Sequence, residues 1–359
     1  MKIINFIPKT VNRSKNSIVE RGNKLIITKC KRSKVLRINK EIILDGFLFE
    51  IVGLYFGDGL NTRSYSGIRR TAFANSNYKL HQYWIKFLSR FGIKKRELFA
   101  QISTHKHADE GKVLEYWIKK THIPKNSFAR VSKSKERCSG FGVLSTEFNS
   151  ITFRLIFNEI FDHCLEILSK KRKFIPNFIK GLFAAEGHVT IRNKSVQMLG
   201  IAIKDHDRRK YVQSLLKKIN VTSSENKPKD ALWITGYFNF KIFEQYKMAS
   251  LHPQKNEKFK RGFLNLSKSW TPGITKTKII AALRKKNLSR GEIATLLEKN
   301  SSLIHKMLRD LEIKRIVKRV GKRNGIRKKI DIWGLGEKRG NIQSIIKYEY
   351  GKPKNTIAQ

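Results

Sequence analysis

Two apolar segments of this chain end in the same way. They read Phe47-Leu-Phe-Glu-Ile-Val-Gly-Leu-Tyr-Phe-Gly-Asp58-Gly59 and Ile175-Pro-Asn-Phe-Ile-Lys-Gly-Leu-Phe-Ala-Ala-Glu186-Gly187. Aligned on their last residues, they match Gly53 with Gly181 and Asp58 with Glu186, 128 positions further along the chain. This internal repeat places one carboxylate at the equivalent position of each half.

Each segment has the length and apolar content of a buried helix of about three turns. Asp45 is suited to cap the first helix, and Pro176 is suited to the first turn of the second. The final residues, Gly59 and Gly187, predict helix ends that need a positive φ angle. Two core helices that end in Asp-Gly and Glu-Gly turns without a functional reason are the simpler alternative.

An acid at the C-terminal end of a helix is unusual, because that end already carries partial negative charge and the placement costs about 0.3–1 kcal/mol. Two such acids at matched positions indicate a bound cation that reverses the sign of the interaction. Asp58 and Glu186, with the backbone carbonyls of Gly57 and Ala185, offer the oxygen ligands that Mg²⁺ (or Mn²⁺) prefers. Two carboxylates that share divalent ions are suited to phosphodiester hydrolysis.

Small residues four apart, Gly53 with Gly57 and Gly181 with Ala185, give each predicted helix one face that a second helix can approach closely. If these two faces pack together, Asp58 and Glu186 lie side by side at one end of the interface. The four small residues are therefore the predicted helix interface.

The chain is strongly basic. Its 359 residues include 76 Lys and Arg against 28 Asp and Glu, a formal net charge of +48. Nucleic acid is the first choice of partner for such a charge. Cys30, Cys138 and Cys164 are isolated, so neither a zinc ribbon nor a disulfide framework is predicted. His105 and His107 lie in the polar stretch 103–112, which we interpret as a solvated loop.

The paired segments resemble the motif of the LAGLIDADG homing endonucleases in their single-chain form with two pseudo-symmetric halves. Neither half spells the family's letters, but both keep the acid. The resemblance covers Phe47–Gly59 and Ile175–Gly187, and more weakly residues 46–266. It implies an α+β fold of two αββαββα halves, with antiparallel saddle-shaped sheets that lie in the DNA major groove. It also implies one basic residue per half near the scissile phosphate. By position, Lys171 or Lys173 and Lys255 or Lys258 are the candidates.

The saddles implied by the resemblance place exposed polar residues against the duplex. These residue types read base edges and phosphates, although a solvated sheet face is the alternative for any one of them. The candidates are Asn61, Arg63, Tyr65, Arg69 and Arg70 in the first half, and His188, Thr190, Arg192, Asn193, Lys194 and Gln197 in the second.

Outside the motif, the pattern predicts alternating helices and strands. The first half has a helix ended by Gly92, strands at 113–120, 127–132 and 141–148, and a helix over 149–168. The second half repeats this order more compactly, with strands near 188–192, 196–203 and 231–235 and helices over 205–219 and 239–246. We predict five regions: 1–45 as a basic N-terminal arm, 46–173 and 174–268 as the two halves, 274–336 as a separate module, and 337–359 as a basic tail.

The C-terminal module begins after the linker Ser269-Trp-Thr-Pro-Gly273. Ser289 and Glu292 form a predicted capping box, and Asn324-Gly325 predicts a hairpin. Three short helices and this basic hairpin resemble a winged helix-turn-helix; a packing or dimerisation module is the alternative. The predicted DNA contacts, from the recognition helix and the wing, include Ser301, Ser302, His305, Lys306, Arg309, Arg323 and Arg327.

These patterns together predict a monomeric, Mg²⁺-dependent, site-specific endonuclease of double-stranded DNA, encoded by an intron or mobile element. A DNA-binding transcriptional regulator without catalysis and an intron RNA maturase remain as alternatives. The sequence shows no signal peptide and no apolar run of 18–20 residues. We expect a protein that is not secreted and that is cytoplasmic, near the nucleoid of a prokaryote, or organellar.

Overall fold

The computed structural model describes residues 1–7, 16–29, 35–59, 70–134, 140–269, 274–324 and 329–336. The chain divides into two compact units, residues 1–266 and 267–359. The division falls a few residues before the predicted linker. No helix within the described ranges is both long and apolar enough to cross a membrane.

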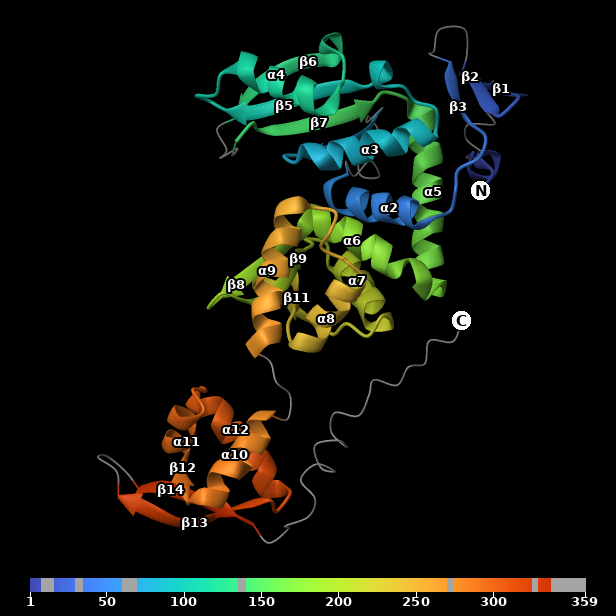
Figure 1. Ribbon diagram of the computed structural model, residues 1–359. Helices are drawn as coiled ribbons and strands as arrows, with labels where there is room; N and C mark the ends of the chain where they lie inside the picture. Colours follow the sequence, from blue (N-terminus) through green and yellow to red (C-terminus); the bar gives the residue numbers. More distant parts are fainter. Residues whose placement is uncertain are drawn as a thin grey trace. The chain divides into compact units, whose positions relative to one another are not determined.

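Two helices form the centre of the first unit, α2 (Gly46–Asp58) and α6 (Ile175–Glu186). They lie side by side in Figure 1 and carry the two repeated segments. The Asp45 carboxylate accepts a hydrogen bond from the Leu48 N–H and so caps α2, and Pro176 lies in the first turn of α6, as the sequence predicted. Both helices are buried on nearly every side, because they carry apolar residues all round rather than on one stripe.

The first half continues from α2 into a four-stranded sheet of order β4-β7-β5-β6. Its elements after α2 are β4 (Thr71–Asn75), α3 (Tyr78–Arg90), β5 (Phe99–His105), α4 (Glu110–Thr121), β6 (Phe128–Ser134), β7 (Val143–Phe148) and α5 (Ile151–Lys170). β5 and β6 are parallel because α4 forms the crossover between them, and the other pairs are antiparallel.

The second half has the sheet order β10-β11-β9-β8, antiparallel throughout. Its elements after α6 are β8 (Gly187–Arg192), β9 (Ser195–Ala202), α7 (His206–Lys218), β10 (Ser224–Asn226), β11 (Ala231–Ile234), α8 (Tyr237–Gln245) and α9 (Pro253–Ser269). The architecture is therefore α+β in two related halves, as predicted.

The repeat extends beyond the two central helices. Gly59 pairs with Phe73 in the first half, and Gly187 pairs with Ile201 in the second, each shifted by 128 positions. The same shift relates α3 to α7, whose N-caps are Asn77 and Asp205. The same offset of 128 positions therefore relates the central helix, the first strand pair and the next helix of one half to those of the other.

Two predicted elements of the first half are wrong. Residues 113–120 form the helix α4 rather than a strand, because Val113, Trp117 and Thr121 recur every four residues on its buried face and Asp109 caps its start. Residues 99–105 form the strand β5, which we had interpreted in part as a loop. His105 therefore lies in a strand and only His107 lies beyond it.

Residues 1–45 do more than form an arm. They contain η1 (Ile3–Phe6) and an antiparallel sheet of β1 (Asn16–Arg21), β2 (Lys24–Lys29) and β3 (Leu36–Asn39). Ile3, Leu25 and Ile38 are fully buried in the core of the first unit. The N-terminal segment is thus packed onto the halves by its own apolar side chains.

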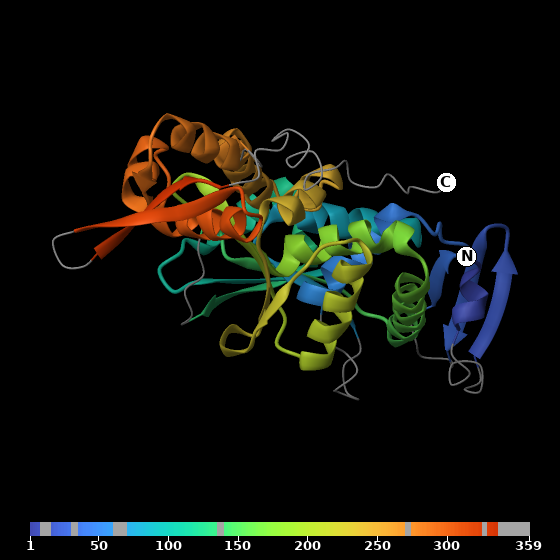
Figure 2. The same cartoon turned by 90° about the horizontal axis from the view of Figure 1, so that it is seen from below.

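The second unit has its own core, which includes Ile279, Ile293, Ile304, Leu308 and Trp333. The predicted capping box between Ser289 and Glu292 is present. The β13–β14 hairpin extends past the helices of its own unit (Figure 2). The elements are α10 (Ile274–Lys285), β12 (Leu288–Ser289), α11 (Arg290–Leu296), α12 (Ser301–Ile313), β13 (Val317–Asn324) and β14 (Lys329–Leu335), with sheet order β12-β14-β13.

Candidate functional site

The interface between α2 and α6 is close enough to require glycine. A Cβ atom on Gly53 would lie 1.9 Å from the Phe178 carbonyl oxygen, and one on Gly181 would lie 1.8 Å from the Glu50 carbonyl oxygen. Each glycine therefore touches the backbone of the other helix, and the contact is symmetric. Further along, a Cβ on Gly57 would lie 2.6 Å from the Ala185 Cβ. The predicted face of small residues is the interface that the structure shows.

Gly59 and Gly187 are required for a different reason from the one predicted. Their φ angles are −76° and −75°, in the extended region that any residue adopts. A Cβ on Gly59 would instead lie 2.3 Å from the Tyr55 carbonyl oxygen, and one on Gly187 would lie 2.3 Å from that of Phe183. The chain turns so tightly from each helix into the following strand that no side chain fits.

This interface brings Asp58 and Glu186 together. The Glu186 Cγ lies 2.8 Å from the position of a Cβ on Gly57, the residue before Asp58. Burial raises the pKa of Asp58 to about 7, and the charge of Glu186 contributes to the rise. Burial also raises the pKa of Glu186. Two half-buried carboxylates that face each other are a site that lacks positive charge.

Lys255, in the first turn of α9, supplies part of that charge. Its ammonium donates to the carbonyl oxygens of Ala184 at 2.6 Å and Ala185 at 2.9 Å, at the C-terminal end of α6. Burial lowers its pKa to about 8, while Asp58 and Glu186 oppose that shift. A lysine at a helix C-terminus offsets the negative end of the helix dipole. No equivalent lysine at the end of α2 is seen among the described residues.

Asp58 has an amide partner instead. The Asn75 side chain, at the end of β4, donates to the Asp58 carboxylate at 2.6 Å. The Asn75 amide oxygen accepts from the Asn77 N–H at 2.7 Å, and the Asn77 side chain lies 3.4 Å from His252 Nε2. His252 in turn accepts from the Lys255 N–H at 3.4 Å. This chain of contacts joins the Asp58 carboxylate to the helix that carries Lys255.

Equivalent positions of α3 and α7 hold the backbone beside each acid. His81 is fully buried, and its Nε2 lies 2.9 Å from the Asn75 carbonyl oxygen while its Nδ1 lies 2.7 Å from the Thr146 hydroxyl. Arg209 is its counterpart 128 positions later. Its guanidinium donates to the carbonyl oxygens of Ile203 and of Lys204, the latter at 2.8 Å.

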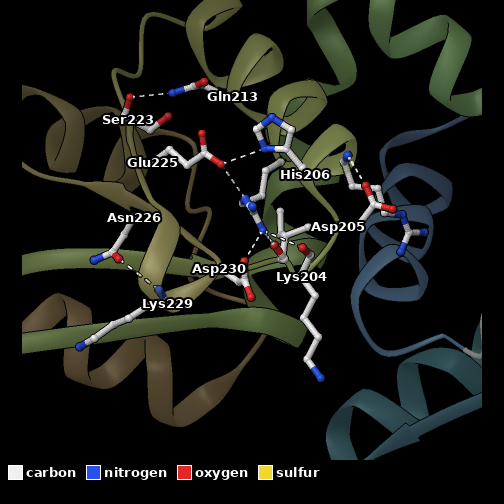
Figure 3. Close-up of polar contacts among 12 residues, drawn as sticks. Lys204, Asp205, His206, Gln213, Ser223, Glu225, Asn226, Lys229 and Asp230 are labelled. Carbon is white, nitrogen blue, oxygen red and sulfur yellow. Dashed lines mark hydrogen bonds and ion pairs between the residues drawn. The ribbon is translucent and has the colours of Figure 1, made fainter.

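Acids of the second half hold that guanidinium in turn. Arg209 Nε donates to Glu225 at 2.9 Å, and Nη1 donates to Asp230 at 2.9 Å. Figure 3 shows Glu225, His206 and Asp230 gathered here, with the Lys204 side chain pointing away from them. The end of β9 is therefore fixed by a charged cluster, where the end of β4 is fixed by a neutral histidine.

An open groove of about 450 Å³ adjoins Glu186. Gly57, Glu186, Lys204 and Arg208 contribute to its lining, which also includes the α7 N-cap Asp205. Lys204 and Glu186 line the same groove, and the charge of Lys204 lowers the pKa of Glu186. The groove thus offers an anion two cations, Lys204 and Arg208, beside two carboxylates, Glu186 and Asp205.

The donor set fits a divalent metal. Carboxylate oxygens and helix-terminal carbonyls are hard ligands of the kind that Mg²⁺ and Mn²⁺ take, and a cation between the acids would offset the burial that raises both pKa values. No cluster of three or more His, Cys, Asp or Glu side chains competes for a metal in the described part of the chain. Asp58, Glu186 and the carbonyls of Gly57 and Ala185 would hold the metal, although Ala185 also accepts from Lys255.

The structure does not bring Lys171 and Lys173 to the acids. Both lysines lie just before the first residue of α6, whereas Glu186 is the last residue of this helix. The 12 residues of α6 therefore separate the two lysines from Glu186 by roughly 18 Å. Lys258 is exposed on α9 and affects only the pKa of His188 among the site's residues. Of the four predicted lysines, Lys255 is the one in contact with the site.

The predicted DNA-contacting residues of the second half lie on β8, β9 and their turn. Asn193 and Lys194 have positive φ angles of 50° and 62°, as a tight hairpin turn requires. His188 lies across Gly200, and its pKa is lowered by burial and by Lys255. The exposed side chains of this hairpin are those of His188, Arg192, Asn193, Lys194 and Gln197, with Thr190 half-buried.

Of the predicted DNA contacts in the first half, Arg70 lies within the described residues. The other four, Asn61, Arg63, Tyr65 and Arg69, lie outside them. In the second unit, Ser302, His305, Lys306 and Arg309 lie exposed along α12, and Ser301 is half-buried. Arg323 is in an ion pair with Glu292 at 3.1 Å, and Arg327 lies outside the described residues.

Sequence reasoning missed Asn75, Lys204 and His252. Their positions carry no local motif. The offset of 128 does not locate them either, because it matches Asn75 with Ile203 and Lys204 with Ser76.

One family model matches part of the chain. Residues 173–247 match the LAGLIDADG-like domain. No curated protein matches the chain. Among solved structures, mesophilic variants of the homing endonuclease I-DmoI match with 19% identity and a TM-score of 0.33. The match covers 58% of this chain and 98% of that chain. I-DmoI in complex with DNA and Mn matches with 17% identity, 57% and 97% coverage and a TM-score of 0.32.

Full-length WhiA from Thermatoga maritima matches with 14% identity, over 76% of this chain and 92% of that chain, at a TM-score of 0.39. The likeness of residues 173–247 to a LAGLIDADG-like domain is therefore what the comparisons show, and the repeat and the helix interface are properties of the chain itself.

Proposed function

This chain carries a LAGLIDADG-like domain, and on that premise we propose that it is a site-specific endonuclease of double-stranded DNA that uses a divalent metal. The observation that supports the proposal most is the meeting of Asp58 and Glu186 at one end of a glycine-lined interface, beside Lys255. The net charge of +48 supports a polyanionic substrate.

In the proposed reaction, Asp58 and Glu186 would each serve the cleavage of one DNA strand. When bound, Mg²⁺ or Mn²⁺ would polarise the phosphate and activate water for in-line attack. Lys255 would stabilise negative charge on the phosphate, and Lys204 and Arg208 would hold the neighbouring backbone in the groove. Asn75 would keep the Asp58 carboxylate in one orientation.

The second unit is proposed as an additional DNA-binding module of winged helix-turn-helix type. The order of its helices and strands and the exposed Lys306 and Arg309 on α12 support this. Replacing both residues with alanine should weaken DNA binding and lower the salt dependence of the affinity by about two counterions. An unchanged salt slope would favour the packing alternative.

The test of the proposed function uses Asp58→Asn and Glu186→Gln. Each should reduce double-strand cleavage to background while DNA affinity stays near that of the parent chain. Because the target is unknown, substrates come from a plasmid library carrying random inserts, with cleavage followed by sequencing of the linear products. Glu159→Gln, the same chemical change at an exposed acid on α5, is the matched control and should cut normally.

Two other results would redirect the proposal. Selective DNA binding without cleavage by the parent chain in Mg²⁺ or Mn²⁺ would favour a non-catalytic regulator on the same fold. Tighter binding of a structured intron RNA than of any duplex would favour a maturase. Normal cleavage by either acid variant would show that the two acids are not the catalytic pair.

A further inference from the structure

One acid of the first half projects from the sheet face that the helices do not cover. The Thr146 hydroxyl bonds His81 of α3, so Thr146 faces the helices. Side chains alternate along a strand, and the next residue of β7, Glu147, therefore points to the opposite face. Glu147 is nevertheless only 3% exposed. A buried acid on the open face of so basic a protein needs a partner, because burying an unpaired carboxylate is costly.

That partner is Arg70. Its Nη1 lies 2.9 Å from the Glu147 Oε2, and the Ser145 hydroxyl donates to the other carboxylate oxygen at 3.1 Å. The Arg70 side chain is 43% exposed, against 4% for Glu147. The acid is thus held from two sides, and it fixes one corner of a guanidinium whose remaining part reaches solvent.

The part of the Arg70 guanidinium that does not contact Glu147 has a defined geometry. Its Nε and Nη2 form a second edge that makes no hydrogen bond with any described residue. Two parallel N–H groups on such an edge match the O6 and N7 acceptors of guanine in the major groove. We propose that Arg70, oriented by Glu147, reads one guanine in the half of the target that the first half contacts. This inference rests on the proposed function.

A phosphate contact alone would not account for the acid. Arginine binds phosphate well without an orienting carboxylate, and an acid beside a polyanion weakens binding. The chain has 28 acids among 359 residues, and this one lies on the sheet face that we propose contacts the DNA. Glu147 is therefore a positioning residue, which holds the guanidinium in the orientation that a base edge requires.

The second half has no acid at the position equivalent to Glu147. In the first half Ala72 pairs with Glu147, and in the second half Gly200, 128 positions after Ala72, pairs with Trp233. The ammonium of Lys229 lies 6.0 Å from the Trp233 ring centre. An indole ring offers no pair of donors to a guanine, so the two halves should differ in base discrimination at related positions of the target.

The experiment selects bound duplexes from a randomised DNA library in the absence of divalent metal and sequences them. The parent chain should enrich guanine at one position of one half-site by roughly five- to hundredfold over other bases, the range for one good bidentate contact. Arg70→Lys should abolish that preference. Glu147→Gln should reduce it severalfold while overall affinity changes little.

Three further measurements decide between roles. The double variant Arg70→Lys/Glu147→Gln should match Arg70→Lys alone, because a positioning residue acts only through its partner. Trp233→Phe, the matched change in the second half, should leave the guanine preference intact. Thermal unfolding shows whether Glu147→Gln remains folded, and if it does not, Arg70→Lys carries the test by itself.

A folded Glu147→Gln chain with an unchanged base profile would overturn the inference and leave a purely structural ion pair. A uniform loss of affinity in Arg70→Lys, with a shallower salt slope and no change in base preference, would overturn it in favour of a phosphate contact. If the parent chain enriches no sequence at all, the proposed function fails instead, so the two failures are distinguishable.

Discussion

Asp58 accepts a hydrogen bond from the amide of Asn75 and lies near the ammonium group of Lys255, whereas Glu186, its counterpart in the second half, lies near the ammonium groups of both Lys255 and Lys204. The backbones around the two acids are nearly interchangeable: each ends a central helix, turns at a glycine and pairs with a strand at the same offset. The comparison teaches that the helix interface fixes the main chain of both halves, while the side chains around each acid are free to differ.

The same contrast appears one layer further out. His81 and Arg209 hold the equivalent carbonyls at the ends of β4 and β9, one as a neutral ring and the other as a charged guanidinium. Glu147 and Trp233 occupy equivalent positions on the open faces of the two sheets. The halves therefore share a frame and carry different chemistry, as a protein that binds an asymmetric target requires.

The largest effect should come from filling the shared helix interface. Gly53→Leu and Gly181→Leu should each unfold the first unit, because the first side-chain carbon would already overlap a backbone carbonyl of the other helix. Ordinary overpacking costs about 1–3 kcal/mol, and a backbone clash on this scale should cost more. Circular dichroism and solubility measure the outcome.

Gly321→Leu in the second unit is the control, since no described atom lies within 4 Å of its Cβ position. It should leave the first unit intact. If only one of the two interface variants unfolds the protein, the contacts of Gly53 and Gly181 are not equivalent. If both remain folded, the helices do not meet as described.

A smaller effect should distinguish Asp58 from Glu186 in the stability of the metal-free protein. The folded pKa of Asp58, about 7, lies above its unfolded value near 3.8, so the folded state keeps a proton that the unfolded state loses. The resulting destabilisation grows as the pH rises from about 4 to 7 and is complete above that range. Asp58→Asn should therefore stabilise the protein at pH 8 by a few kcal/mol, and hardly at all at pH 4.

Glu186→Gln should act in the same direction but more weakly, because Lys255 and Lys204 both offset the burial of Glu186, whereas at Asp58 the charge of Glu186 adds to the effect of burial. Urea unfolding in the presence of a chelator, at pH 4 and pH 8, measures both variants. A larger gain for Glu186→Gln, or equal gains at the two pH values, would contradict the difference inferred between the halves.

The smallest effect concerns the two residues that hold the strand ends. Burial lowers the pKa of His81 to about 4, below the unfolded value near 6.5. Its stabilising contribution is complete above pH 6.5 and is lost as the pH falls from there to about 4. The counterpart of His81 in the second half is an arginine, so the loss of stability that comes from a strand-end histidine should arise in the first half alone.

Nitrogen NMR of the histidine rings tests this directly. His81 should remain neutral down to about pH 4, with its proton on Nε2, the atom that faces the Asn75 carbonyl. The urea-unfolded chain should titrate near pH 6.5 and serves as the reference. A His81 ring that becomes protonated at pH 6 in the folded protein would show that the strand end of the first half is held in another way.

Sequence alone predicted the central helices, their glycine faces and the pairing of Asp58 with Glu186. These features are local patterns repeated at a fixed spacing, so a one-dimensional comparison finds them. It failed at α4, where Val113 and Trp117 have high strand propensity, because tertiary packing selects the helical spacing over the propensity of single residues. It also favoured Lys171 and Lys173, which precede α6 in the chain and lie at the wrong end of it.

What only the tertiary structure decided is which side chains surround the acids. Lys255 and His252 come from the start of a helix about 70 residues after Glu186, and Asn75 comes from the end of a strand 17 residues after Asp58. The sequence offered Lys255 only as one of four lysines chosen by position, and nothing in the neighbourhoods of His252 and Asn75 marks those two residues. Contacts across such separations depend on how helices and sheets pack, and the energy of packing belongs to the assembled core rather than to any segment. The sequence by itself therefore determined the frame and its two acids, and the fold decided their partners.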